Sequence, residues 1–436
     1  MSFIRSLGGL GLALAAVAGL AVLFLALIVV TNGAWSGTPA WLITAGVGAA
    51  AAIWRGRRRT RPRLLVPVAV AAVLTAAVLI PTVPTDRQYP SDLAFVATQH
   101  WSLATGSQVA VYHYPPDPDT TPRSTPLVFL HGGPVRSISV IDHEFLQLLA
   151  RHGYDVYAYE QAGGGRSGLL SMDQYSIDRS VRDFGAFIEH LDAGPVDVLG
   201  FSAGGVVLTR ALADPDFSTL VRKAIVAEPG PMDGPTARID GQPGLPNARG
   251  LAPAVPGPRS TNVPRYAVAF GLMRLGLLSP DSDLIGQAEG VNAFTAADLG
   301  GDTASAYCAQ DAHRIPVEDT TENFSFSAAA SMQIQQTIKD SPSIIEGLGR
   351  STVPTMLMIA ECSSQTRQWA TAVLAANPTV ERTQYMPGVG HHMWNGLDDN
   401  DERAYAAVDA FLQGAQAPLP NYPTPADIPE FLNQDD

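Results

Sequence analysis

Hydrophobic residues are arranged in two different ways along the chain. The part before Asp86 contains three long apolar runs, at 7–30, 40–54 and 64–84. A helix rises about 1.5 Å per residue, so the first and third runs are long enough to cross a hydrocarbon core of about 30 Å. The pattern predicts a transmembrane anchor of about three helices at residues 1–85.

From residue 91 onward, short apolar runs alternate with helical patterns. Ile177, Val181, Phe184, Ile188 and Leu191 recur at steps of four and three residues, which is one face of a helix. Segments that predict strands occur at 95–104, 108–114, 127–130, 154–159, 196–199, 224–227, 355–359 and 383–386, and those at 127–130 and 154–159 are short apolar runs. Strands separated by helices predict an α/β fold, with a mostly parallel sheet that carries helices on both faces.

The interval 232–351 breaks this alternation. It begins with many prolines and glycines and continues with two helical patterns. We interpret it as a helical cap inserted between two late strands. The main domain would then comprise residues 86–231 and 352–416, and 417–436 would form an extended tail.

Charge divides the chain at the same point as hydropathy. The whole chain has 28 Lys and Arg against 41 Asp and Glu, a net charge of −13, yet the part before Asp86 carries seven arginines and no acid. Six of these arginines lie at 55–63, between the second and third apolar runs, and the positive-inside rule places such a loop in the cytoplasm. We therefore expect a multi-pass protein of the cell membrane, with the lipid bilayer as a partner and the main domain outside the cytoplasm. The acidic balance argues against a nucleic-acid partner.

The strongest chemical signal is the sequence Gly-Phe-Ser-Ala-Gly at 200–204. It matches the G-x-S-x-G nucleophile elbow, in which glycines permit a tight strand-to-helix turn that exposes the serine hydroxyl. The motif follows a predicted strand at 196–199 and precedes a helical pattern at 206–212, which is the context it requires. Ser202 is therefore predicted to be a nucleophile.

Two further segments supply partners for Ser202. Gly-His-His at 390–392 follows the last predicted strand, and His391, directly after the glycine, is preferred to His392 as the general base. His-Gly-Gly-Pro at 131–134 ends another strand. There the backbone N–H groups of Gly133 and Ala203 are predicted to form an oxyanion hole.

These motifs, with Glu-Gln-Ala-Gly-Gly-Gly-Arg-Ser at 160–167, resemble the proline iminopeptidase branch of the α/β-hydrolases. The resemblance covers roughly residues 95–412 without the cap. It implies an α/β-hydrolase fold and a serine hydrolase that cleaves an acyl bond of a small-molecule or peptide substrate through an acyl-enzyme, without a cofactor or metal. Val135, Glu160 and Ala203 stand where the branch usually has Gly, Asp and Trp, so a carboxylesterase or lipase remains an alternative to an aminopeptidase.

The triad acid has two candidates. The branch usually carries Asp after the penultimate strand, but here Ser363 stands at that place. Glu361, which precedes His391 at a plausible spacing, is the first choice, and Glu228, at the end of the strand after the nucleophile helix, is the alternative. The missing Asp also leaves open a catalytically inactive hydrolase fold that serves as a binding domain.

The two cysteines exclude a disulfide-dense scaffold and a multi-cysteine metal site. Cys308 lies in the expected cap and Cys362 lies next to Glu361. In a domain outside the cytoplasm these two residues could form a disulfide that ties the cap to the catalytic loop. Two free buried thiols are the alternative.

Overall fold

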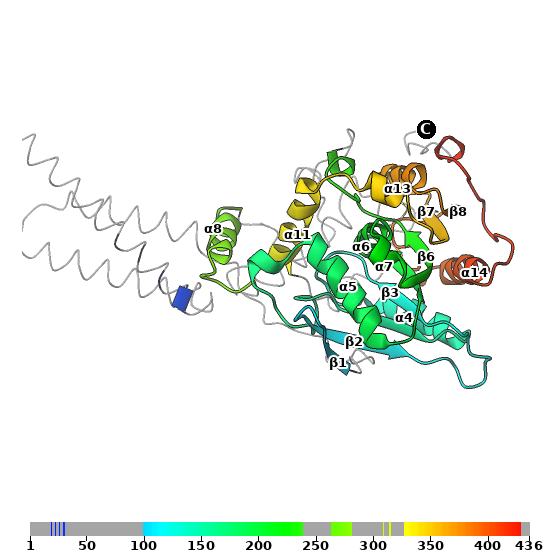
Figure 1. The fold of residues 1–436 in the computed structure, drawn as a ribbon, viewed down its shortest axis with the longest axis horizontal. Helices are drawn as coiled ribbons and strands as arrows, with labels where there is room; N and C mark the ends of the chain where they lie inside the picture. Colours follow the sequence, from blue (N-terminus) through cyan, green and yellow to red (C-terminus); the bar gives the residue numbers. More distant parts are fainter. Residues whose placement is uncertain are drawn as a thin grey trace, which may run out of the picture. The chain divides into compact units, whose positions relative to one another are not determined.

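The computed structural model describes residues 99–238, 263–280 and 327–428, together with single residues at 19, 22, 26, 29, 30, 308 and 314 (Figure 1). The chain divides into two compact units, residues 1–87 with 257–290, and residues 88–256 with 291–436. The described part of the first unit is chiefly α8 (Val263–Arg274). The second unit contains the sheet and the predicted functional residues.

The second unit is built on an eight-stranded sheet with the order β1-β2-β4-β3-β5-β6-β7-β8. β1 pairs with β2, and β2 with β4, in antiparallel fashion. The neighbouring pairs among β4, β3, β5, β6, β7 and β8 are all parallel. Every predicted strand overlaps one that is observed, which confirms the mostly parallel sheet. The strands are β1 (Gln99–Ser102), β2 (Gln108–Tyr114), β3 (Leu127–Leu130), β4 (Val156–Tyr159), β5 (Val196–Phe201), β6 (Val221–Ala227), β7 (Thr355–Ala360) and β8 (Val380–Met386).

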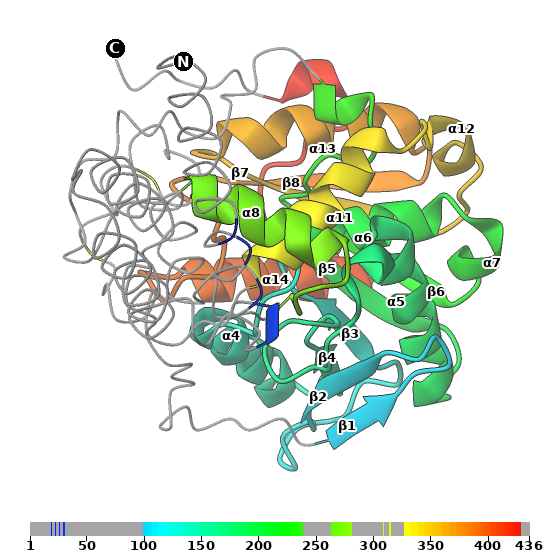
Figure 2. The same ribbon diagram turned by 90° about the vertical axis from the view of Figure 1, so that its left-hand side faces the viewer.

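Helices cover both faces of this sheet (Figure 2). α4 (Val140–Arg151) and α14 (Asn400–Leu412) pack together on one face. α5 (Ile177–Leu191), α6 (Ala203–Leu212) and α13 (Ser364–Ala376) lie on the other. The remaining helices described in this unit are α7 (Pro215–Ser218), α11 (Ala328–Asp340) and α12 (Ile345–Leu348), with single 3-10 turns at Met172–Gln174, Thr236–Arg238 and Pro425–Asp427.

Side chains of β7 point alternately to the two faces of the sheet. Met356, Met358 and Ala360 join the apolar core beneath α4 and α14. Ile359 points the other way and packs with Ala370 of α13. Since side chains alternate across a strand, a fully apolar run such as this one is what a sheet covered on both faces requires.

α5 illustrates why the predicted helix forms. The side chain of Ser176 caps its first turn by accepting a hydrogen bond from the backbone N–H of Arg179, and Asp192 ends it in a left-handed conformation. The apolar residues at the predicted helical spacing are buried, apart from Leu191 at its end. One apolar face and two caps thus fix both the position and the length of this helix.

The prediction of a multi-pass membrane protein with its main domain outside the cytoplasm is contradicted. No helix in the described part of the chain is both long and apolar enough to cross a bilayer. The longest of them, α5, has 15 residues, whereas a span needs about 20. The expected spans at 7–30, 40–54 and 64–84 lie outside the described residues, apart from five single positions in the first.

Candidate functional site

Ser202 occupies a sharp turn between the end of β5 and the start of α6. Its backbone has φ 53° and ψ −115°, a region that residues with a side chain rarely adopt. A Cβ on Gly200 would lie 2.7 Å from the carbonyl oxygen of Gly204, and a Cβ on Gly204 would lie 2.0 Å from that of Leu130. Only glycines fit at these two places. The half-buried Ser202 side chain makes no hydrogen bond with any described residue, so its hydroxyl is available for chemistry.

His391 lies against this turn and contacts a buried carboxylate. Its ring centroid is 5.0 Å from that of Phe201, the residue before Ser202. Its Nδ1 is 3.2 Å from Oε2 of Glu228. The His391 side chain is 19% exposed, whereas that of Glu228 is completely buried. The imidazole therefore has one end held by a carboxylate and the other without a hydrogen bond to any described residue.

Glu228 stands one residue beyond the end of β6, in a left-handed conformation with φ 45°. Its Oε1 accepts a hydrogen bond of 2.7 Å from the backbone N–H of Ala360, while Oε2 faces His391. Both oxygens thus have partners. Because a carboxylate oxygen can only accept, Nδ1 of His391 donates, and the lone pair of its Nε2 stays available.

Glu361, the first choice for the acid from the sequence, makes a different contact. Its Oε2 accepts a hydrogen bond of 2.6 Å from the backbone N–H of Gly388. Its own N–H donates to Met386, and the N–H of the next residue, Cys362, donates to Val389. Glu361 thus ties the turn after β7 to the loop that leads to His391, and the structure brings His391 together with Glu228 instead.

The loop after β3 borders the nucleophile. A Cβ on Gly132 would lie 2.9 Å from the Cβ of Ser202, so a side chain at position 132 would collide with the turn. The N–H groups of Gly133 and Ala203, the two predicted oxyanion donors, donate to none of the described residues. Val135, where the resemblance leads one to expect glycine, has φ 62°, so the loop keeps the left-handed bend that glycine adopts more easily.

His131 is buried in this loop and is neutral. Burial, together with the positive charge of Arg136, lowers the pKa of His131 to about 4. Its Nε2 accepts a hydrogen bond from the backbone N–H of Gln161, so its Nδ1 carries the proton and donates to the carbonyl oxygen of Gly132 at 2.8 Å. His131 therefore shapes the loop.

Glu160 in the segment 160–167 is also a structural group. Its buried carboxylate accepts hydrogen bonds from the hydroxyl of Tyr112 and from the backbone N–H groups of Ile138 and Arg166. Burial raises the pKa of Glu160 despite these bonds. Its contacts join the loop after β3 to the loop after β4.

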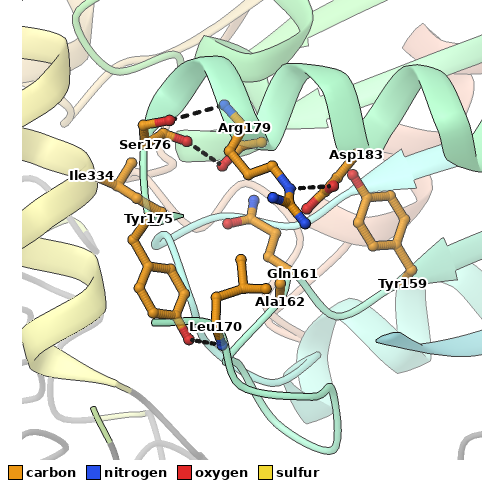
Figure 3. Close-up of a pocket in the computed structure, with 10 residues that line it drawn as sticks. Tyr159, Gln161, Ala162, Leu170, Tyr175, Ser176, Arg179, Asp183 and Ile334 are labelled. Atoms are coloured by element: carbon orange, nitrogen blue, oxygen red, sulfur yellow. Dashed lines mark hydrogen bonds and ion pairs between the residues drawn. The ribbon is translucent and has the colours of Figure 1, made fainter. Parts of the chain in front are cut away.

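A small pocket lies between the loop after β4 and α5 (Figure 3). Its charged pair, Arg179 and Asp183, is joined by a hydrogen bond of 2.9 Å, and the hydroxyl of Tyr175 accepts a hydrogen bond from the backbone N–H of Leu170. Neither Ser202 nor His391 lines this pocket. The pocket therefore does not include the candidate nucleophile or base.

Cys308 and Cys362 form a disulfide, with Cα atoms 5.2 Å apart. The bridge joins the segment between β6 and β7 to the turn that follows Glu361. Within the described residues, no group of three or more His, Cys, Asp or Glu side chains is placed to hold a metal ion.

Three buried residues near the site are not identified by the sequence patterns. Arg136 and Asp142 form an ion pair of 2.9 Å, and the indole N–H of Trp394 donates to the second oxygen of Asp142. One signal could have identified Asp142: it stands three positions after Ser139, the spacing of a capping box, which the structure contains. Trp394 comes after the last strand of the sheet, and no local pattern links it to this pair.

Comparison with known proteins agrees with this architecture. A family model described as "Alpha/beta hydrolase family" matches residues 127–408, more than half of the chain. A proline iminopeptidase from Lactiplantibacillus plantarum is 34% identical over 90 residues, which is 20% of this chain and 31% of that protein. The chain thus matches less than a third of the length of this curated relative.

Solved structures resemble this chain at low sequence identity. A carboxylesterase structure from the thaumarchaeon Nitrososphaera gargenis has a TM-score of 0.50 and 17% identity, covering 72% of this chain and 98% of that one. A proline iminopeptidase from Mycobacterium smegmatis has a TM-score of 0.44 and 19% identity, covering 72% and 100%. With the sheet order, the elbow at Ser202 and the family match in agreement, the chain belongs to the alpha/beta hydrolase family.

Proposed function

We propose that this protein is a serine hydrolase in which Ser202 is the nucleophile, His391 the general base and Glu228 the triad acid. The observation that carries the proposal is the contact between Nδ1 of His391 and the buried carboxylate of Glu228, made where the imidazole ring packs beside the Ser202 turn. A base oriented by an acid and placed next to a strained nucleophile turn is the arrangement that acyl transfer requires. The left-handed backbone at both Ser202 and Glu228 supports it, because such strain collects at functional sites.

In the proposed first step, Oγ of Ser202 attacks the substrate's carbonyl carbon while Nε2 of His391 takes the hydroxyl proton. The carbonyl π electrons move to oxygen, and the N–H groups of Gly133 and Ala203 bind the resulting oxyanion. Glu228 stabilises the imidazolium through Nδ1–H. Collapse of the intermediate breaks the bond to the leaving group, which receives the proton from Nε2. Water then attacks the acyl-enzyme by the same route, and free Ser202 is regenerated.

The substrate class we propose is an acyl compound, with a peptide cleaved at its N-terminus as the first candidate. The local similarity to a proline iminopeptidase, together with the motifs at 131–134, 160–167 and 200–204, supports this choice. An ester is the second candidate, because Val135 and Ala203 differ from that branch.

A substrate panel tests the proposal. The full-length protein is assayed with aminoacyl-p-nitroanilides and with p-nitrophenyl esters of increasing chain length, alongside Ser202→Ala. We expect turnover in the wild type and a loss on the order of 10³-fold or more in Ser202→Ala, because removing the nucleophile leaves only the oxyanion hole and binding. Faster cleavage of nitroanilides than of esters would favour the peptidase arm, and the reverse order the esterase arm.

Ser218→Ala is the matched control, since Ser218 ends α7, beyond the far end of α6. It should leave turnover unchanged. Equal rates for Ser202→Ala and the wild type would overturn the proposed mechanism. A wild type that hydrolyses neither class and is not modified by an active-site-directed fluorophosphonate would instead point to the inactive binding domain.

A further inference from the structure

Arg136 is a buried arginine that lies beside the candidate site. Its side chain is 4% exposed and makes hydrogen bonds through all of its nitrogens. Nε donates to the carbonyl oxygen of Gly132 at 2.6 Å, one terminal nitrogen donates to the carbonyl oxygen of Ser137 at 3.2 Å, and the other donates to Asp142 at 2.9 Å. A buried ion pair contributes little net stability because both charges lose their hydration. Stability alone therefore does not account for a guanidinium at this position.

The position of Arg136 fixes the orientation of one peptide group. The carbonyl oxygen of Gly132 accepts two hydrogen bonds, from Arg136 and from Nδ1 of His131. In a planar trans peptide, the carbonyl and the following N–H point in opposite directions. The N–H of Gly133 must therefore point away from Arg136, and it donates to no described residue. Since Gly132 packs against the Cβ of Ser202, this N–H borders the nucleophile.

We infer that Arg136 is a positioning residue for the oxyanion hole. Its guanidinium holds the Gly132–Gly133 peptide with the N–H directed at the oxyanion that forms on the substrate. A charge-assisted hydrogen bond to the carbonyl also polarises the peptide, which makes the Gly133 N–H a stronger donor. This role rests on the proposed serine hydrolase function, and the reaction gains from it only when negative charge develops on the substrate.

Asp142 anchors the guanidinium. Its fully buried carboxylate accepts hydrogen bonds from Arg136, from Ser139 and from the indole N–H of Trp394. Burial raises the pKa of Asp142, but Arg136 and the hydrogen bonds outweigh this effect and the net shift is downward, so the carboxylate stays ionised.

Trp394 connects Asp142 to the segment that carries His391. It stands three positions after His391, and its ring stacks on Phe145 of α4 with centroids 4.5 Å apart. The same ring lies 4.9 Å from that of Phe201, which precedes the nucleophile. The Arg136–Asp142 pair is thus held by α4 and by the loop that carries His391, and a rigid anchor of this kind is what a preorganised oxyanion donor needs.

Three variants test the inference in the full-length protein. Arg136→Gln removes the charge, Arg136→Lys keeps it without the planar fork, and Arg136→Gln with Asp142→Asn removes both charges so that no carboxylate is left buried and unpaired. For each, kcat is measured per active site, counted by fluorophosphonate titration, with KM and the inhibition constant of a trifluoromethyl ketone or boronic acid that mimics the tetrahedral intermediate.

We expect Arg136→Gln and the double variant to lose about 10- to 100-fold in kcat, with KM within about threefold. Binding of the tetrahedral mimic should weaken by the same factor as kcat, whereas binding of the reaction product should not. Arg136→Lys should recover part of the loss. A residue that only supports folding would lower the number of active sites or the melting temperature without changing kcat per site or the affinity ratio.

Arg123→Gln is the control, because Arg123 forms an ion pair of similar length with Asp409, at 3.0 Å, although this pair is partly exposed. It should leave kcat per site and inhibitor affinity unchanged. A wild-type kcat per site in Arg136→Gln and in the double variant would overturn the inference while leaving the proposed function intact. A wild type that neither turns over nor binds fluorophosphonate would overturn the proposed function, and the inference with it.

Discussion

Glu228 and Glu361 occupy equivalent places in the sheet yet make different contacts. Each stands one residue beyond the end of a parallel strand, and the two strands, β6 and β7, are neighbours. Glu228 is fully buried, has a left-handed backbone, and faces His391. Glu361 is half-buried and accepts from the backbone N–H of Gly388. Position after a strand is therefore not enough to choose between the two carboxylates, and our proposal of Glu228 as the acid rests on its contact with His391.

Two histidines in loops that follow strands of the sheet, His131 and His391, also differ in burial. His131 is completely buried and shapes the loop after β3 through Gly132, whereas His391 is partly exposed beside Ser202. A general base must reach the substrate, but the acid behind it need not. Burial thus fits a triad acid and a structural histidine, and partial exposure fits the base.

The largest loss of turnover is expected from a variant that breaks the contact between Glu228 and His391. Glu228→Gln keeps the shape of the side chain but removes its charge, so the imidazolium that forms in the reaction loses its stabilisation and the imidazole its preferred tautomer. We expect turnover of the best panel substrate to fall on the order of 10³-fold. The melting temperature of the variant shows whether it is folded, and a loss of less than about tenfold in a folded variant would contradict the role of Glu228.

The next prediction concerns the stability that is lost when the disulfide beside Glu361 is removed. The bridge spans 54 residues, and closing a loop of that length stabilises a fold by about 4 kcal/mol in the chain-entropy model, with about 2–4 kcal/mol typical. Cys308→Ser should therefore lower the free energy of unfolding by a few kcal/mol, on the scale of that estimate, measured by urea denaturation without reductant. Wild type with reductant should show the same loss. Equal unfolding curves for all three would show that the bridge contributes nothing.

The third effect tests whether His131 is neutral. Its folded pKa of about 4 lies below the ordinary value of 6.5, so the unfolded chain binds the proton more readily. The resulting stability is fully present above pH 6.5 and is lost as the pH falls toward 4, by about 3 kcal/mol. His143, whose pKa burial also lowers to about 4, contributes in the same direction. Urea unfolding between pH 4 and 7 should show a shallower pH slope for His131→Gln than for wild type, and identical slopes would contradict this assignment.

The smallest effect on turnover is expected for a substitution of Glu361, the carboxylate that bonds Gly388. Glu361→Gln keeps an oxygen that can accept from the N–H of Gly388, so the turn after β7 should persist. We expect turnover within about threefold of the wild type and a loss of stability of about 1 kcal/mol, because a hydrogen bond to a neutral oxygen is worth less than one to a charged oxygen. Steady-state kinetics of this variant beside Glu228→Gln decides which carboxylate serves His391. A loss in Glu361→Gln as large as in Glu228→Gln would remove the distinction.

The sequence predicts the sheet and the nucleophile turn because both have local patterns. The central strands, such as β3 and β7, are short apolar runs. The glycines around Ser202 are required by contacts of 2.7 Å and 2.0 Å at Gly200 and Gly204. The helix at 177–191 is predicted by the spacing of its apolar residues, and its caps lie at its two ends.

The contacts of the acid cannot be read in the same way. Glu228 is distant from His391 along the chain and Glu361 is much nearer, so sequence spacing favours the residue that makes no contact with the imidazole. The left-handed conformation of Glu228, one residue beyond β6, is likewise found only in the structure. The contacts around Arg136 cannot be predicted from local patterns either, because its partner Asp142 bonds Trp394, which lies 252 positions later in the chain.

The most direct test of the proposed triad is the rate at which an active-site-directed fluorophosphonate modifies the full-length protein. The phosphonylated residue is identified by mass spectrometry, and the rate is compared among wild type, Ser202→Ala, Glu228→Gln and Glu361→Gln. We expect one label on Ser202, no label in Ser202→Ala, a rate reduced on the order of 10²-fold or more in Glu228→Gln, and a rate near that of the wild type in Glu361→Gln. A label on another residue, or a slow reaction in Glu361→Gln with a normal one in Glu228→Gln, would contradict the triad.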